Sequence, residues 1–154
     1  MRTAVSIVVL ALTISVGACG GPQDQGFTAA DAAAIRKASA DLTAAFNAKD
    51  VDKILTLYAD NSVFMPPNAP LIRGRESLKG FFTNLTRTAS NLRMDPVEVA
   101  GHGPIAYQSG PYSLTNGGTP DRGKFLFVMR NMMGTWRFEY TMWSSDLPPR
   151  VSGN

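Results

Sequence analysis

Apolar side chains recur every three to four positions in the first half of the chain, which predicts helices. A first amphipathic helix is predicted over residues 31–48, and Thr28 and Asp31 have the spacing of a capping box at its start. A second, shorter helix is predicted over residues 51–58. A third begins at Gly74 and carries its apolar side chains on one side.

In the second half of the chain the period changes to two, which predicts strands. Four strands are expected, over residues 92–100, 105–114, 124–131 and 135–144. Their glycine-rich connections favour an antiparallel meander. Another strand is expected over residues 62–65, because Pro66 and Pro67 cannot donate ladder hydrogen bonds and must end it. Helices that precede strands in one domain predict an α+β fold, with the helices on one face of the sheet.

The predicted strands are apolar on both faces. In residues 124–131, Phe125, Phe127 and Met129 share one face, while Leu126 and Val128 take the other. The helices can cover only one of these faces. We therefore expect a second copy of the chain to cover the other face, in a homodimer.

The N-terminus has the pattern of a bacterial lipoprotein signal peptide. Arg2 is followed by an uncharged run over residues 4–16, too short to span a bilayer, which needs roughly 20 apolar residues. Val-Gly-Ala-Cys at residues 16–19 resembles a lipoprotein processing box, which implies removal of residues 1–18 and a lipid on Cys19. Cys19 is the only cysteine, so no intrachain disulfide can form. A signal peptide without lipidation is the main alternative.

The rest of the chain divides into a tether, a domain and a tail. Residues 19–27 are glycine-rich and polar, as in a flexible tether, residues 28–145 form the domain, and residues 146–154 are a polar tail. Because Gly20 rather than aspartate follows the cysteine, we expect the periplasmic face of the outer membrane if the cell is Gram-negative. The chain has 15 basic and 12 acidic side chains without a basic stripe, so no nucleic-acid partner is expected.

One segment, residues 46–82, carries a family resemblance. It contains N-A-x-D at Asn47–Asp50, Y-A-D at Tyr58–Asp60 and R-G-x-E at Arg73–Glu76. Their order and spacing resemble the nuclear transport factor 2-like superfamily, above all its SnoaL-like and ketosteroid isomerase-like small domains. The resemblance implies a cone, in which a strongly curved, mainly antiparallel sheet wraps a long helix around a pocket. Members of this superfamily include isomerases, dehydratases, cyclases and non-catalytic binding or association modules, so membership alone does not imply chemistry.

The same resemblance assigns the catalytic positions of isomerase-like members to apolar residues. The general base position falls on Met65, and the two oxyanion-binding positions fall near Leu42 and Phe127. None of these side chains transfers a proton or donates a strong hydrogen bond, so catalysis is uncertain and not favoured. We expect Met65 to form part of an apolar pocket wall instead. The complete expected lining is Leu42, Phe46, Tyr58, Met65, Phe82, Tyr107, Tyr112, Phe127 and Trp143.

Two other residues, Asp60 and His102, carry side chains capable of proton transfer. Asp60 is a weak candidate for a general base and fits a turn residue better. His102 is the only histidine and lies between two glycines, so neither a metal site nor a cofactor is expected.

Three functions stay open from the sequence. The leading hypothesis is an envelope-tethered, non-catalytic domain that binds a small, mostly apolar molecule. The second is an isomerase, dehydratase or cyclase with unusual catalytic groups, such as Asp60 with a pocket tyrosine. The third is an association module whose cone is filled by its own side chains.

Overall fold

A capping box starts the long helix α1 (Ala29–Asn47) in the computed structural model, which describes residues 26–148. The Thr28 hydroxyl accepts a hydrogen bond from the Asp31 backbone N–H at 3.2 Å, and the Asp31 carboxylate accepts one from the Thr28 N–H at 2.9 Å. Hydrogen bonds from Thr28 and from the Trp136 indole lower the pKa of Asp31. The stability that these bonds contribute is therefore present above the unfolded-state pKa and is lost as the pH falls through the lowered one.

The second helix is shorter than predicted. α2 ends at Thr56 (Val51–Thr56), and strand β1 (Tyr58–Met65) already begins at Tyr58. The helix ends there because the next backbone groups form hydrogen bonds with the sheet instead of continuing the helix. The Leu57 carbonyl accepts a hydrogen bond at 2.9 Å from the Phe138 N–H, next to the point where β1 pairs with the last strand.

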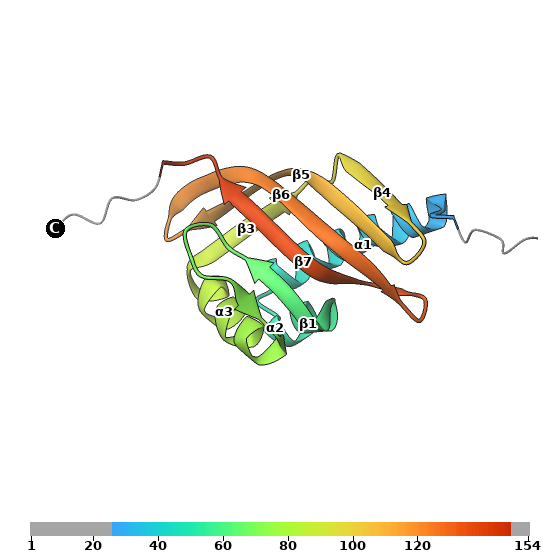
Figure 1. Ribbon diagram of the computed structural model, residues 1–154. Coiled ribbons are helices and arrows are strands. Elements are labelled where there is room, and N and C mark those ends of the chain that lie inside the picture. Colours follow the sequence, from blue (N-terminus) through green and yellow to red (C-terminus); the bar gives the residue numbers. More distant parts are fainter. Residues whose placement is uncertain (1–25, 149–154) are drawn as a thin grey trace, which may run out of the picture.

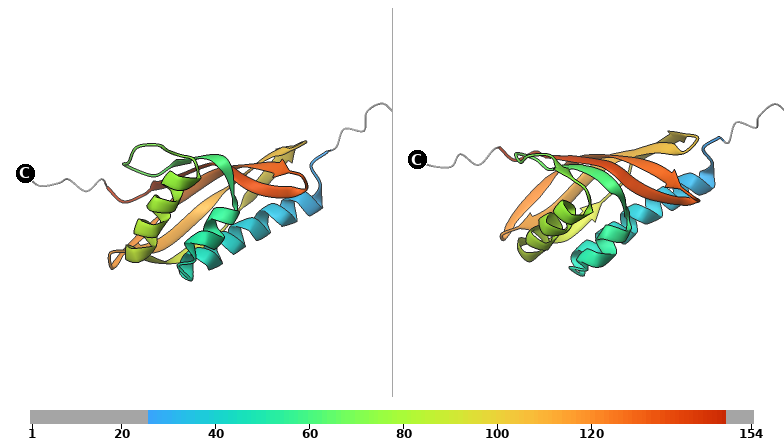
Figure 2. Two further views of the ribbon diagram at one scale, coloured as in Figure 1. Left: turned by 90° about the horizontal axis from the view of Figure 1, so that it is seen from below. Right: turned by 60° about the horizontal axis from the view of Figure 1, so that its bottom comes forward.

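Three helices lie on one face of a seven-stranded sheet, as Figures 1 and 2 show. The remaining elements are β2 (Ile72–Arg73), α3 (Arg75–Thr88), β3 (Ala89–Met94), β4 (Glu98–His102), β5 (Ile105–Asn116), β6 (Thr119–Met132) and β7 (Thr135–Ser145). The strand order is β2-β1-β7-β6-β5-β3, with β4 also on β5. All pairs are antiparallel except β1 with β7. The sheet is curved and open, so the predicted α+β fold is confirmed.

The strand predicted over residues 92–100 is in fact two strands. β3 ends at Met94 and β4 begins at Glu98. Pro96 in the gap has no N–H to donate. The chain also passes so close to Gly110 on β5 that a Cβ there would lie 1.9 Å from the Asp95 carbonyl oxygen. Both features favour a break in the strand at this point.

Candidate functional site

The inner face of the sheet and the helices enclose a small apolar cavity, which we call the cone cavity. Its volume is about 30 Å³. Small-molecule sites occupy roughly 300–1,000 Å³, so the cone cavity has room for only a few atoms. Within residues 26–148, the cone is largely filled by its own side chains.

Seven of the expected lining residues do line this cavity. They are Leu42, Phe46, Tyr58, Phe82, Tyr112, Phe127 and Trp143. Whether they bind a ligand stays a prediction. The expected list omitted five further lining residues, Leu85, Leu92, Met94, Leu114 and Phe125. The alternation of strands β5 and β6 does signal Leu114 and Phe125, because each lies an even number of positions from an inward-facing tyrosine or phenylalanine.

Met65 lies on the other side of the sheet, which corrects the expectation that it forms the pocket wall. In the parallel pairing with β7, Phe64 is opposite Thr141 and Met65 is opposite Met142. Thr141 is buried, whereas Met142 is 44% exposed. Successive side chains of a strand point to opposite faces, so Phe64 turns inward and Met65 outward. The base position that the family resemblance assigns to Met65 therefore lies on the outer face of the sheet and not in the pocket wall.

Tyr107 is also outside the cavity, contrary to expectation. Its neighbour Gln108 faces inward and is completely buried, so Tyr107 faces outward. The Tyr107 hydroxyl donates a hydrogen bond to the Glu98 carboxylate at 2.5 Å, and this bond raises the pKa of Tyr107.

Asp60 points to solvent rather than into the cone. Its side chain is 87% exposed, and its carboxylate lies 3.4 Å from the Arg75 guanidinium. Asp60 is not among the residues that line the cone cavity. Cys19 lies outside the described residues.

Two of the residues that line the cone cavity are tyrosines, Tyr58 and Tyr112. Burial raises the pKa of Tyr58, whose ring packs 5.1 Å from that of Phe138. Burial, followed by the charge of Asp121, raises the pKa of Tyr112, whose hydroxyl lies 3.3 Å from the Asp121 carboxylate. Both hydroxyls are protonated at neutral pH. A protonated phenol cannot act as a general base, so neither tyrosine supplies that role.

These raised pKa values predict a loss of stability at alkaline pH. The unfolded chain releases tyrosine protons above about pH 10, whereas the folded chain retains them on Tyr58 and Tyr112, so the free energy of unfolding falls as the pH rises. We expect both side chains to ionise only as the domain unfolds. In an alkaline titration, the tyrosinate absorbance that Tyr58 contributes should appear at the same pH at which circular dichroism shows the domain unfolding. In the Tyr58→Phe variant, the free energy of unfolding should fall less steeply as the pH rises. Ionisation of every tyrosine before unfolding would contradict this.

Within the described part of the chain, metal and membrane-spanning sites are not found. No group of three metal-binding side chains occurs among residues 26–148. No helix in that range combines the length and apolarity that crossing a bilayer requires.

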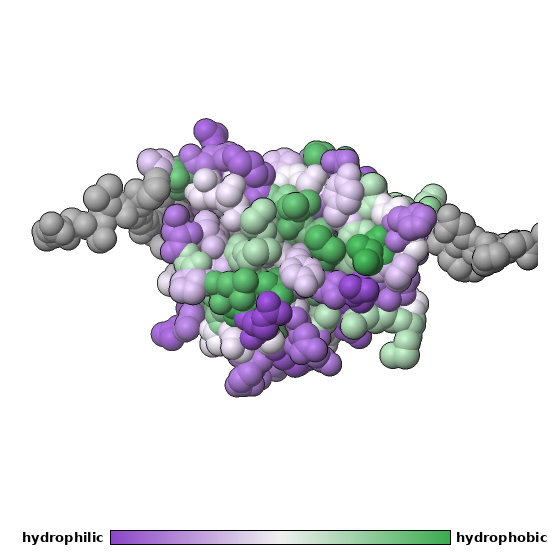
Figure 3. Space-filling view, viewed as in Figure 1, coloured by the Kyte–Doolittle hydropathy of each residue, from purple (hydrophilic) through white to green (hydrophobic). Residues whose placement is uncertain are grey.

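The second candidate site is the outer face of the sheet, turned away from the helices. We define the outer patch by its apolar members on strands β1, β5, β6 and β7: Met65, Tyr107, Leu126, Val128, Tyr140 and Met142. Figure 3 shows apolar residues gathered over β1, β7 and β6 on this face. Leu126, Tyr140 and Met142 are each exposed by 41–44%.

Strand pairing makes the outer patch continuous. One cross-strand row joins Met65 to Met142 and Met142 to Leu126. A parallel row joins Tyr140 to Val128, and Val128 to Tyr107. Directly paired side chains have Cβ atoms about 5 Å apart, so each row is one contiguous apolar strip. Strips of this kind across several strands are typical of protein–protein contact surfaces.

The family model described as SnoaL-like domain matches residues 40–144. The chain belongs to the SnoaL-like domain family. No curated protein matches it. The family assignment agrees with the fold but leaves the activity of this SnoaL-like chain open.

Solved structures with the same fold differ widely in their described roles. A ketosteroid isomerase-like protein from Erwinia carotovora atroseptica SCRI1043 is 23% identical, with 79% of this chain and 100% of that chain covered and a TM-score of 0.70. A candidate dehydratase of the NTF2-like family from Streptomyces avermitilis is 14% identical, with 79% and 100% covered and a TM-score of 0.69. A candidate calcium/calmodulin dependent protein kinase II association domain from Xanthomonas campestris is 19% identical, with 80% and 91% covered and a TM-score of 0.63. At these identities the likeness shows the fold alone.

Proposed function

We propose that this SnoaL-like domain is a non-catalytic association module of the bacterial cell envelope, and that its outer patch binds a second copy of the chain. The main support for the proposal is that the same domain has a nearly filled cone and an apolar outer patch. The cavity of about 30 Å³ leaves little space for a substrate. The candidate association domain from Xanthomonas campestris is a precedent for association on this fold.

The outer patch suits a symmetric interface. In a twofold dimer the same surface serves both partners, so an apolar patch is complementary to itself. The Arg130 guanidinium and the Glu139 carboxylate form an ion pair, 2.8 Å apart, beside the outer patch. The edge of the patch therefore has one positive and one negative side chain. An apolar centre with a charged rim is the usual anatomy of a protein interface.

The mass of the chain in solution tests this proposal. The chain from Cys19 onward, produced without a lipid, should sediment as a dimer at about 10 μM, a concentration well above the dissociation constant of a standard-sized interface. A monomer at every concentration up to that value would overturn the proposal.

We also propose that Cys19 carries the lipid that anchors the domain. The support is the sequence of residues 1–19, in which an uncharged run ends in small residues before the cysteine. Expression in a Gram-negative cell should yield a membrane-bound chain whose first residue is an acylated Cys19, as seen by mass spectrometry. Cys19→Ser should leave the chain without acyl groups. An unmodified Cys19 on the processed wild-type chain would refute the anchor.

A small apolar ligand is the second candidate, and one observation favours it. Three lining residues, Leu85, Met94 and Trp143, are only partly buried, so the cone cavity comes close to the surface there. The flexible Met94 side chain could move aside and enlarge it. Purified domain incubated with envelope extract should then retain a compound that mass spectrometry identifies, and Met94→Trp should abolish retention. A consistently empty protein would refute this candidate without affecting the proposed dimer.

A further inference from the structure

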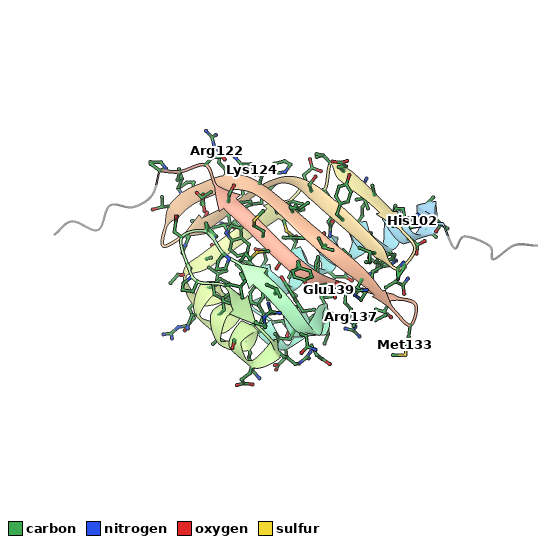
Figure 4. The ribbon with its side chains drawn as sticks, in the orientation of Figure 1. His102, Arg122, Lys124, Met133, Arg137 and Glu139 are labelled. Carbon is green, nitrogen blue, oxygen red and sulfur yellow. The ribbon has the colours of Figure 1, made fainter. Side chains whose placement is uncertain are left out.

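One end of the molecule brings together the start of α1 and two strand turns. The Phe27 ring packs 5.9 Å from the Trp136 ring at the start of β7, and the Trp136 indole donates a hydrogen bond to Asp31 at 3.0 Å. The Asn131 N–H donates to the Pro104 carbonyl at 2.8 Å, which joins the β6–β7 turn to the β4–β5 turn. We call this surface, formed by Phe27, Pro104 and the turn at residues 132–134, the tether end (Figures 1 and 4).

The β6–β7 turn presents apolar side chains to solvent at the tether end. Met132 is 38% exposed and Met133 is fully exposed. Figure 4 shows Met133 at the tip of the β6–β7 hairpin, with Arg137 and Glu139 farther from the tip along the sheet. Nothing among the described residues covers the Met133 side chain, so its apolar surface is fully open to solvent.

The backbone makes Met133 an unusual choice for this position. Met133 has φ 51° and Gly134 has φ 84°, and tight hairpin turns with two positive φ values favour asparagine, aspartate or glycine. The β5–β6 turn, at the opposite end of the molecule, has Gly117 and Gly118 at φ 56° and 78°. An exposed apolar side chain in a left-handed conformation therefore occurs at the tether end and not in the corresponding far turn.

We propose that the tether end lies on the lipid bilayer, with Met132 and Met133 inserted into its interfacial region. The inference rests on the proposed lipid at Cys19. Phe27 follows Cys19 by eight positions, so even a fully extended tether keeps it within about 28 Å of the anchored residue. Because Phe27 packs against the start of β7, the methionine turn is on the end of the domain held nearest the bilayer.

The charges near the turn favour apolar insertion over attraction to anionic lipid. The Arg130 guanidinium is 2.8 Å from the Glu139 carboxylate, and the Arg137 guanidinium donates to the Thr56 carbonyl. Asp31 adds a negative charge beside Trp136. With charges of both signs at this end, we expect contact with zwitterionic bilayers as well as anionic ones.

The methionine turn can contact the bilayer stably only when the tether already holds the domain at the membrane. Burying one methionine side chain favours the bound state by roughly ten- to a hundredfold, too little to hold a freely diffusing protein on a membrane. The same factor is sufficient to orient a domain that a short tether already holds at the surface. We therefore expect the untethered domain to remain in solution.

Coupling through Cys19 allows a test that does not depend on processing in the cell. The chain from Cys19 onward contains every helix and strand described and has one thiol, so it can be attached to maleimide lipids in phosphatidylcholine vesicles. Hydrogen exchange of the amides at residues 132–134 should slow about tenfold on coupling, because insertion shields them. Exchange at residues 116–119, in the far turn, should not change.

Two variants of Met133 and one control variant in the far turn decide whether Met133 makes the contact. Met133→Asp should abolish the slowed exchange, Met133→Leu should retain it, and Asn116→Asp in the far turn should have no effect. Equal exchange on and off the vesicles, or slowed exchange that survives Met133→Asp, would overturn the inference. If exchange slows on vesicles but mass spectrometry finds an unmodified Cys19 in cells, only the proposed lipid anchor is refuted. If Cys19 is acylated in cells but exchange does not slow on vesicles, only the membrane contact is refuted.

Discussion

Phe64→Asp will unfold the domain at neutral pH, whereas Met65→Asp will leave it folded. Phe64 is 1% exposed, and its ring packs 4.8 Å from the rings of Phe81 and Trp143. Removing a buried phenylalanine costs about 3–5 kcal/mol, and burying an unpaired carboxylate in its place adds to this. Met65 is partly exposed on the other face, where a substitution should cost no more than about 1 kcal/mol.

Urea unfolding measures the difference. Both changes should be made in a Leu126→Asp background, so that the loss of the proposed dimer does not contribute to the result. A folded Phe64→Asp variant together with an unfolded Met65→Asp variant would reverse the register of β1. It would return Met65 to the inside of the cone, beside the tyrosines, and would reopen the comparison with the base of isomerase-like proteins.

Leu126→Asp will raise the dissociation constant of the dimer by at least about a hundredfold. The substitution occurs on both partners, so the one twofold interface would then bury two carboxylates in its apolar centre. Leu126 pairs with Met142 within the outer patch. It is 41% exposed in the isolated chain, so the monomer should remain folded. The dissociation constant can be measured by sedimentation equilibrium, with circular dichroism as the check on folding.

A matched control comes from the helical side of the molecule. Thr83→Asp adds the same charge at an exposed position of α3, on the face opposite to the outer patch, and should leave the dissociation constant unchanged. A dimer that tolerates Leu126→Asp but is broken by Thr83→Asp would place the interface on the helices. A dimer unaffected by both would place it elsewhere.

Local periodicity was sufficient to predict the main elements. The Thr28 capping box, the start of α3 after Gly74 and the antiparallel order of β5, β6 and β7 are confirmed. These features depend on neighbours in the sequence, which a helical or alternating pattern records directly. The family resemblance added the curvature of the sheet, which periodicity alone does not reveal.

The error at Met65 has a different physical origin. The β1–β7 register shifts between Tyr58 and Val63, so the two strands do not advance residue for residue. A slip of one position exchanges the two faces of a strand, and no local pattern in Tyr58–Met65 marks the irregularity. The family resemblance, aligned through N-A-x-D and Y-A-D, therefore indicates the right strand but the wrong face.

The volume of the cavity could not be predicted from the sequence either. Alternation indicates which side chains face inward, but the remaining volume depends on how twelve lining residues from helices and strands fit together. Leu92 and Met94 line the cavity from β3, which ends at Met94, whereas the sequence predicts a single strand over residues 92–100. The largely filled cone is the reason to favour association over ligand binding.

Methionine oxidation, measured residue by residue with peroxide and mass spectrometry, tests the proposed interface most directly. Met142 is 44% exposed in the isolated chain, Met133 is fully exposed and Met129 is completely buried. As the concentration of the unlipidated chain rises, oxidation of Met142 should slow in proportion to the dimer fraction. Met133 should react at a constant rate, and Met129 should stay reduced. Oxidation of Met142 at the same rate relative to Met133 at every concentration would contradict an interface on the outer face of the sheet.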